Sequence, residues 1–444
     1  MYKRLIVFGC WLLASHFYLT AQTAWAEIDS LTYGQYMRSE WDSVLLATQQ
    51  SLAQGVDFYY LRLRAGKAAY EQKKYRLASQ HFSKAHQWNK HDEFVLYWYY
   101  WSLLLSGRLD EAHTLASGFS EDFLARNQLT PPKRVKSVFA TYQWSTNHAY
   151  KKQMEESIQT EGSYINYRSI PKTQQYTAVG LEHTLGRQVY VMHNLSQLNI
   201  ERSQQFESEY PRLDRTQGAT TRQYTYYLQA RFPLKNAWMV STSYARLWGQ
   251  SSSHWVTFQN NPTPIVTEYN DAIRDSYYSV GLSKDFSLLQ IRLSTSLGSI
   301  REYAQFQLNP SIRLYPFANN KLVSKSEWAL HWDESENGVK QVFHQSIASN
   351  LGPAWLSADV SLGPIRNYSF YDSDAVYNMP EEIRKMMGLS ISTSLFNYKM
   401  FLTTRYQWTE KTGESFHYTN PTDYSTQPFS FTEAHFLIRL LWNL

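Results

Sequence analysis

The hydrophobic pattern changes its period once along the chain. From residue 27 to about residue 130, apolar side chains recur every three or four positions, which is the spacing of one face of an α-helix. Pro131 and Pro132 end this stretch, and after them the period becomes two, as in a strand with one apolar and one polar face. The pattern therefore predicts a helical region followed by an all-β region.

The segment 222–234 shows the two-residue period most clearly. Every second residue from Tyr224 to Leu234 is apolar or aromatic, and the residues between them are mostly Gln, Thr and Arg. The same alternation recurs at 289–298, 389–395 and 400–408. A second face made of small polar residues lacks the aliphatic bulk of a soluble core, so the two faces of these strands are expected to meet different solvents.

Fourteen strands are predicted, and tight turns alternate with connections that are mostly longer. The predicted strands are 134–144, 174–185, 187–200, 221–234, 237–248, 275–284, 288–299, 304–315, 321–332, 340–350, 354–363, 387–396, 399–408 and 431–444. The longest connections, expected to be loops, are 145–173, 201–220, 249–274, 364–386 and 409–430. Within one of these loops, the run from Glu381 to Met386 favours a short helix.

An even number of strands of about ten residues, with short turns on one side and long loops on the other, is typical of an outer-membrane β-barrel. Because the number of strands is even, the barrel begins and ends on the same side. The helical region and the C-terminus are therefore expected on the short-turn side, in the periplasm. A soluble β-sandwich or propeller is the alternative, because it also contains many short alternating strands.

Composition adds an aromatic excess and little charge. Of the 444 residues 16% are aromatic, mean hydropathy is −0.50, and 43 Lys and Arg balance 38 Asp and Glu. Tyr and Trp side chains suit polar–apolar boundaries. The composition excludes a disordered chain and a disulfide scaffold, and without a basic stripe no nucleic-acid partner is expected.

The first 26 residues are predicted to be a secretory signal peptide. Lys3 and Arg4 precede an apolar stretch, and Ala24-Trp25-Ala26 has the small-x-small form of a cleavage site. Cleavage would remove Cys10, the single cysteine of the chain. The exported protein would then contain neither a disulfide nor a cysteine metal site.

The helical region contains a spacing of small and aromatic residues that resembles a tetratricopeptide repeat. Ala65-Gly66-Lys67-Ala68-Ala69-Tyr70 is followed by Tyr75, Ala78, Phe82 and Ala85, and a second, degenerate copy continues to about Phe123. A further helix pair is expected in residues 28–56. The resemblance implies a concave groove for a protein or glycan client, formed by Tyr60, Lys67, Tyr70, Glu71, Phe94, Tyr97 and Trp101. Packing of this apolar face against neighbouring structure is the alternative.

Catalytic and cofactor motifs are not found in the sequence. It has no nucleophile elbow, zinc-protease, phosphate-loop or dinucleotide motif. His183 and His193 flank the turn at Gly186, but period two places His183 and Glu182 on opposite faces of a strand. We therefore predict no catalytic, cofactor-binding or metal-binding residues, and no enzymatic activity.

The whole pattern resembles in architecture the surface lipoprotein assembly modulator family and, more loosely, outer-membrane exporters of polysaccharide. The fold class expected is α + β, with a signal peptide at 1–26, a periplasmic repeat domain at 27–131 and a barrel of about 14 strands at 132–444, bounded by outer-membrane lipid. The strand ending at Leu444 alternates like the C-terminal signal of such barrels, which implies insertion by the barrel-assembly machinery.

The resemblance implies a non-enzymatic protein that aids export or surface assembly of a protein, lipoprotein or polysaccharide client. The client would be delivered through the periplasmic repeat domain. A passive channel with the repeats as a scaffold is the first alternative, and an enzyme with its site at the barrel rim is the second.

Overall fold

The computed structural model describes residues 25–208, 213–258, 264–336, 338–420 and 422–444. The predicted signal peptide falls on residues 1–24, which lie outside the described residues, and on two residues beyond them. Two compact units make up the chain: a helical unit, which comprises the chain up to Pro132 and the two turns Phe286–Leu288 and Tyr315–Asn320, and a barrel unit, which comprises the rest of the chain from Lys133. Each unit is described by itself.

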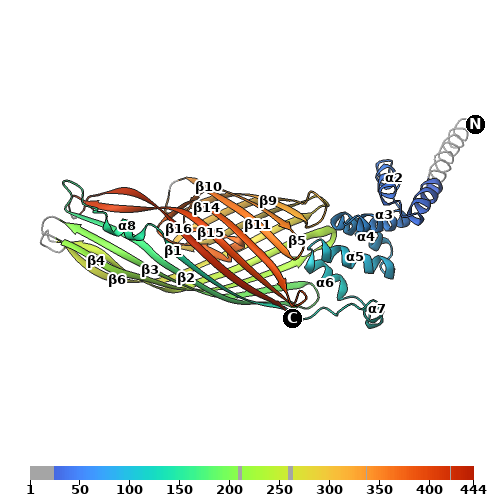
Figure 1. Cartoon of the computed structure of the whole chain (residues 1–444), viewed down its shortest axis with the longest axis horizontal. Helices are drawn as coiled ribbons and strands as arrows, with labels where there is room; N and C mark the ends of the chain where they lie inside the picture. The colour runs from blue at the N-terminus through green and yellow to red at the C-terminus, as the bar shows by residue number, and fades with distance from the viewer. Residues whose placement is uncertain (1–24, 209–212, 259–263, 337, 421) are drawn as a thin grey trace, which may run out of the picture. The chain divides into compact units, whose positions relative to one another are not determined.

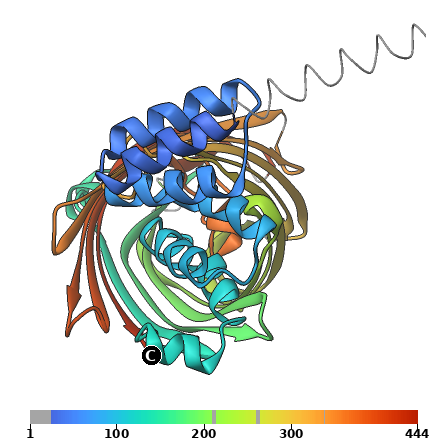
Figure 2. The same cartoon turned by 90° about the vertical axis from the view of Figure 1, so that its right-hand side faces the viewer.

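The helical unit consists of antiparallel helix pairs (Figure 2). A helix covering 25–37 is followed by Trp41–Ala53 (α2), Tyr59–Glu71 (α3), Tyr75–Trp88 (α4), Glu93–Leu105 (α5), Leu109–Ala116 (α6) and Glu121–Arg126 (α7). These helices confirm the predicted helical region, including the helix pair expected in residues 28–56. Among the helices that the structure describes, none has the length and apolar character needed to span a bilayer.

The helix pairs recur every 34 residues. The first helices of the three pairs end at residues 37, 71 and 105, and the second helices begin at residues 41, 75 and 109. Each turn contains a left-handed residue two positions after the end of the first helix, with φ of 58° at Ser39, 58° at Lys73 and 78° at Gly107. A left-handed residue after a helix lets the chain reverse within a few residues, so the periodicity of the sequence reappears as a periodicity of backbone geometry.

Small residues allow the paired helices to approach closely. Ala69, Ala78, Phe82, Ala85 and Val95 form a buried core. A Cβ atom on Gly66 would lie 2.8 Å from the Phe82 ring, so this position of α3 has room only for hydrogen.

The barrel unit is a closed antiparallel sheet of fourteen strands (Figures 1 and 2). Its order around the barrel is β1-β16-β15-β14-β11-β10-β9-β8-β7-β6-β5-β4-β3-β2. The strands are Val135–Asn147 (β1), Ile165–Leu185 (β2), Val189–Ser208 (β3), Leu213–Pro233 (β4), Trp238–Phe258 (β5), Pro264–Asp285 (β6), Leu289–Ile300 (β7), Tyr303–Leu314 (β8), Leu322–Asp333 (β9), Val339–Asn350 (β10), Ala354–Ile365 (β11), Glu382–Leu395 (β14), Met400–Tyr418 (β15) and Tyr424–Asn443 (β16). The predicted barrel is confirmed, and a sandwich or propeller is excluded.

The two faces of the wall have the predicted polarity. Leu293 and Leu389 point outward and are 49% and 64% exposed, whereas Ser294 and Ser296 point inward and are buried. Inward positions are mainly small or amide side chains, including Ser137, Asn194, Gln223, Gln229, Ser241, Ser243, Ser279, Gln307 and Ser361. An apolar exterior around a polar interior is the arrangement of a barrel whose outer face contacts lipid.

Three predicted loops are instead parts of strands, which corrects the sequence interpretation. Most of 201–220, 249–274 and 409–430 continues the ladders of β3 to β6, β15 and β16. As a result β2 to β6 have 20 to 22 residues, whereas β7 to β11 have 12 each (Figure 1). The prediction was wrong because the extended part of the wall carries no apolar outer stripe, so no period of two in hydrophobicity marks it.

The mouth at the loop end is narrowed by an additional strand pairing. Beyond the ends of β1 and β14, residues Ser415 to Tyr418 of β15 pair with Ile165 to Arg168 of β2. The sheet β15-β2-β3-β4-β5-β6 therefore curves into a smaller enclosure beyond the loop ends of the 12-residue strands β7 to β11, which we call the short wall.

Candidate functional site: a plugged lumen with a chamber above it

The connection between β11 and β14 folds into the barrel lumen. We call residues 366–381 the plug hairpin. It contains the two-stranded sheet of Tyr368–Phe370 (β12) and Ala375–Tyr377 (β13), joined by the 3-10 turn Tyr371–Ser373 (η2). Gly363 begins the departure from the wall, at a bulge with φ of 129°, where a Cβ atom would lie 2.3 Å from the Gln341 carbonyl oxygen. Only glycine fits this bend.

Polar contacts join the plug hairpin to every strand from β3 to β9. Arg292 Nη2 donates to Asp372 Oδ2 at 2.6 Å, and Gln307 Nε2 donates to the Ser369 carbonyl at 2.9 Å. The remaining contacts are Asn194 with Asp374, Gln223 with Asn378, Ser243 with the Asp372 carbonyl, Ser279 with Ser373, Asp333 with Asn367, and Arg202 with Glu381. The small polar inner face predicted from the sequence is thus the docking surface of the plug hairpin.

Apolar packing holds the opposite side of the plug hairpin. Tyr368 is buried in a cluster with Ala329, Val342, Ile365, Ile383 and Met386, and Phe370 and Tyr377 pack against that cluster. Ile383 and Met386 belong to β14, so the predicted helix at 381–386 is wrong. Pairing with β11 and β15 overrides the helix propensity of this run.

A buried ion pair joins the last residue of the plug hairpin to the barrel wall. The Arg202 guanidinium of β3 makes a bidentate contact with the Glu381 carboxylate, and the Nη2–Oε2 distance is 3.0 Å. The side chains are only 8% and 3% exposed. Breaking such a pair leaves a buried charge without its partner, which costs much more than removing both charges.

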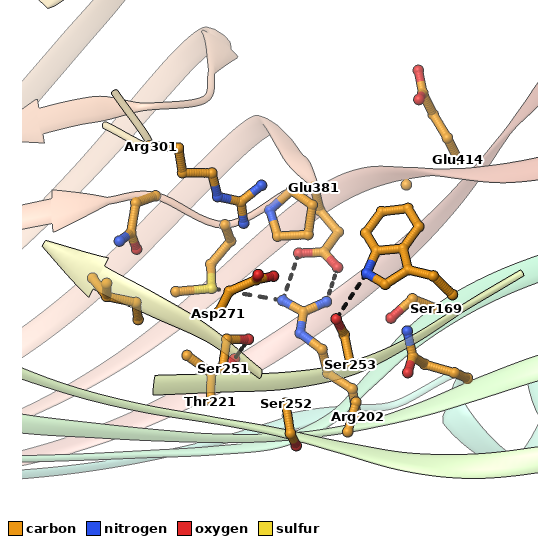
Figure 3. A pocket seen from close by; sticks show the side chains of 18 of the residues that line it. Ser169, Arg202, Thr221, Ser251, Ser252, Ser253, Asp271, Arg301, Glu381 and Glu414 are labelled. Carbon is orange, nitrogen blue, oxygen red and sulfur yellow. Dashed lines mark hydrogen bonds and ion pairs between the residues drawn. The ribbon is translucent and has the colours of Figure 1, made fainter. Parts of the chain in front are cut away.

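A chamber of about 500 Å³ lies beside this ion pair, within the extended part of the wall (Figure 3). Residues 378–381 of the plug hairpin line it on one side. In Figure 3, Arg301, Asp271 and Glu414 surround the Arg202–Glu381 pair, and Ser251 lies against Thr221. Other residues that line the chamber are Tyr167, Ser169, Gln204, Ser252, Ser253, Trp255, Asp275, Glu302, Arg366 and Phe416.

Aromatic side chains gather just beyond the chamber, toward the loop end. Phe258 lies 6.0 Å from Tyr164 and 6.1 Å from Tyr418, and Tyr418 lies 5.4 Å from Tyr424, measured between ring centroids. On β5 and β15 these residues follow the chamber residues Trp255 and Phe416 by two or three positions. The aromatic cluster therefore adjoins the chamber on the side away from the plug hairpin.

The histidine clusters do not form a catalytic arrangement. Ser145 Oγ lies 2.5 Å from His435 Nδ1, but Ser145 is only 1% exposed. The His435 Nε2 atom is 3.1 Å from the Thr409 hydroxyl and 3.7 Å from the Glu433 carboxylate, and that carboxylate is itself paired with Lys411 at 2.7 Å. A nucleophile needs access to substrate and a base oriented by a third group. No group of three or more potential metal ligands occurs within the described ranges.

The structure places His183 and Glu182 on opposite faces, as predicted. His183 Nε2 lies 3.0 Å from His193 Nε2, and His193 contacts Tyr226 on the outer face. Glu182 points inward and is paired with Arg231.

The seven residues of the predicted groove lie on α3 and α5, and Trp98 connects several of them. Lys67 pairs with Glu71 and places its ammonium 3.5 Å from the Trp98 ring centroid, while Tyr70 meets Trp98 edge-on at 4.6 Å. Tyr97 lies 5.0 Å from Trp98 and 6.4 Å from Trp101. Tyr60 and Phe94 are 58% and 37% exposed.

The sequence interpretation missed Trp98 because this residue lies outside the positions carried over from the repeat family. Burial raises the pKa of Tyr70 to about 12, so its hydroxyl stays protonated at neutral pH. Trp101 Nε1 is buried and has no hydrogen-bond partner among the described residues.

No known family model matches the chain, and no curated protein matches its sequence. Among solved structures, the toluene transporter TodX of P. putida is similar over 74% of this chain and 94% of its own, with 6% identity and a TM-score of 0.45. The translocator domain of autotransporter NalP from Neisseria meningitidis matches over 76% and 94%, with 8% identity and a TM-score of 0.30. A bacterial polysaccharide outer membrane secretin matches over 69% and 98%, with 8% identity and a TM-score of 0.34. Likenesses at this level say nothing about substrate.

Proposed function

We propose that the protein is a non-enzymatic outer-membrane factor for export or surface assembly of a client, with a barrel that the plug hairpin closes at rest. The helical unit would receive the client in the periplasm. The observation that carries the proposal is the attachment of residues 366–381 to seven consecutive strands by side-chain contacts. A lumen filled by a docked hairpin differs from the water-filled lumen of a porin.

The connectivity of the barrel supports the proposed periplasmic side for the helical unit. Its first and last strands meet at the short-turn end, where the Leu444 N–H donates to the Lys136 carbonyl at 2.9 Å. Short turns face the periplasm in outer-membrane barrels. Because the helical unit immediately precedes β1, it would be attached on the periplasmic side.

Client binding is assigned to the face of α3 and α5 that carries the aromatic residues around Trp98. The 34-residue recurrence of helix pairs and left-handed turns supports a tetratricopeptide-like unit, whose first helices form a binding face. Exposed Tyr60 and Phe94, together with Trp101, offer aromatic anchors of the kind that dominate protein interfaces.

Two experiments test the proposal. A photo-crosslinking residue at position 101 should capture an exported protein, lipoprotein or polysaccharide in cells, whereas the same probe at exposed Leu46 on α2 should not. Equal capture at both positions, or capture of neither, would contradict a client face.

The second experiment tests closure. In planar bilayers the native protein should rarely conduct, and replacement of residues 368–377 by a short Gly-Ser linker should give steady conductance. If the native protein conducts as steadily as the linker variant, the passive-channel alternative is correct.

A further inference from the structure

We propose that the chamber above the plug hairpin is a binding site for an oligosaccharide. This inference deepens the proposed function, because it assigns a glycan as the substance handled at the loop end of the barrel. It is argued from the size of the chamber, from its walls and from an unpaired acceptor at its base.

The size fits a small ligand or a short segment of a chain. A volume of about 500 Å³ lies within the range of about 300–1,000 Å³ that is usual for small-molecule sites. A folded protein is far too large for it. The chamber can therefore hold a few linked rings.

The walls combine aromatic faces with hydroxyl groups. Trp255 is 43% exposed and lies 6.0 Å from Tyr167, and Tyr167 lies 5.8 Å from Phe416. Ser253 accepts the Trp255 indole N–H at 2.9 Å, which fixes the orientation of the ring. A rigid aromatic face beside hydroxyl groups offers contacts to both the C–H face and the hydroxyl groups of a sugar ring.

Charged groups of both signs point into the same space (Figure 3). Arg301 and Asp271 lie to one side of the Arg202–Glu381 pair, and Glu414, from β15, lies to the other. These groups can donate to and accept from several hydroxyls at once. An alkyl chain would remove water from them without replacing its hydrogen bonds, which argues against a fatty acid or hydrocarbon.

One buried acceptor at the base of the chamber lacks a partner. Asn378 is 6% exposed, and its Nδ2 donates to Gln223 Oε1 at 2.8 Å. Its Oδ1 has no hydrogen-bond partner among the described residues. Leaving a buried acceptor unpaired is costly, so a hydroxyl that reached this oxygen from the chamber would be stabilised there.

The test measures binding by the full-length protein in detergent micelles. Maltotriose, chitotriose and an array of bacterial surface oligosaccharides are the probes, with decanoate and a Gly-Lys-Gly tripeptide as competitors. Binding of at least one oligosaccharide is expected, and Trp255→Ala should weaken it about tenfold. The matched control is Trp238→Ala, which removes an outward-facing tryptophan of the same strand and should leave binding unchanged.

A second variant guards against misfolding of Trp255→Ala. Asp271→Asn keeps the shape of the side chain and should also weaken binding, while both variants retain the gel-mobility shift of a folded barrel on heating. Absence of oligosaccharide binding, equal binding in Trp255→Ala and Trp238→Ala, or binding of only decanoate or the tripeptide would overturn the inference. Oligosaccharide binding without client capture at position 101 would leave the chamber assignment standing and remove the proposed export function.

Discussion

The two units of this protein use opposite interiors. The helical unit excludes water with alanine and phenylalanine, as at Ala69, Ala78 and Phe82, whose side chains are fully buried. The barrel buries serine, glutamine and arginine inside and exposes leucine and isoleucine outside. The comparison shows that each unit places its apolar side chains away from water. In the helical unit they form the core, and in the barrel they cover the outer face.

The units therefore differ in how they are stabilised. In the helical unit, close packing dominates, so changes of volume should be most damaging. In the barrel, the interior is fixed by hydrogen bonds and ion pairs, so changes of charge should be most damaging. Four experiments would break or sharpen this comparison.

The largest effect is expected from Arg202→Ala. It leaves the Glu381 carboxylate buried without its partner, at a cost of about 3–5 kcal/mol. Openings of the plug hairpin in planar bilayers should become roughly 10²- to 4 × 10³-fold more frequent. The double variant Arg202→Met with Glu381→Leu removes both charges and should stay mostly closed. If the single variant opens no more often than the double variant, the ion pair does not hold the plug hairpin.

The lipid-facing side should be sensitive to charge according to depth. Leu293→Arg near the middle of the short wall should cost about 2–4 kcal/mol, whereas Val339→Arg at the loop end of β10 should cost about 0–1 kcal/mol. Both side chains point outward, at 49% and 60% exposure. Unfolding of the barrel from lipid vesicles by urea measures the two costs, and equal values would argue against the assigned membrane position.

The helical unit should respond to added volume. Gly66→Val places a side chain against the Phe82 ring, 2.8 Å from its Cβ position, and should destabilise the unit by about 1–3 kcal/mol. Gly34→Val has the same helix propensity cost but meets only the Arg38 guanidinium, at 3.4 Å. Thermal melting followed by the helical circular dichroism signal compares the two. Similar losses in both variants would show that packing at Gly66 is not tight.

Acid should destabilise the helical unit through His81. Burial, reinforced by the Arg62 guanidinium 3.2 Å from its Nδ1, lowers the pKa of His81 to about 3. Between pH 6.5 and pH 3 the unfolded chain, in which His81 has the ordinary pKa near 6.5, therefore binds more protons than the folded chain. The free energy of unfolding is highest above pH 6.5 and falls as the pH is lowered toward 3. The slope is about 1.4 kcal/mol per pH unit.

The helical circular dichroism signal in urea, recorded at several pH values, measures this dependence. His81→Gln should flatten it, and His91→Gln at an exposed position should not. An unchanged slope in His81→Gln would assign the acid sensitivity to other groups.

Much of the fold could be predicted because the local alternation of apolar and polar residues matches the lipid on one face of each strand and the polar interior on the other. All fourteen wall strands follow from period two, since each has a lipid face such as Leu293 and a polar face such as Ser294. The upper parts of β3 to β6 could not be predicted, because Ser251 and its neighbours have no lipid face. There the strand is maintained by backbone pairing and polar side-chain contacts such as that between Thr221 and Ser251, which leave no hydrophobic period in the sequence.

The plug hairpin could not be predicted because its partners are remote in sequence. Arg292 and Asp372 are 80 residues apart, and Arg202 and Glu381 are 179 residues apart. No local signal marks either pair. The repeat positions, by contrast, are local, so the sequence could predict that these residues share α3 and α5, while their role as a groove stays a prediction. It missed Trp98 of α5, which contacts Lys67 and Tyr70 of α3.

The position of the plug hairpin in the chain has a consequence for the order of assembly. The side-chain hydrogen bonds that attach it to the wall come from β3 to β9, which precede it, while β14 to β16 follow it and add the Lys411 ammonium over the Tyr377 ring. Sealing of the wall requires β1 to meet β16 at the far end of the chain, and the β2–β15 pairing then narrows the loop-end mouth. The hairpin can therefore dock on a still-open sheet, before the last seam forms. A newly made barrel would then be shut from the moment it closes, and it would never expose the cell to an unguarded hole.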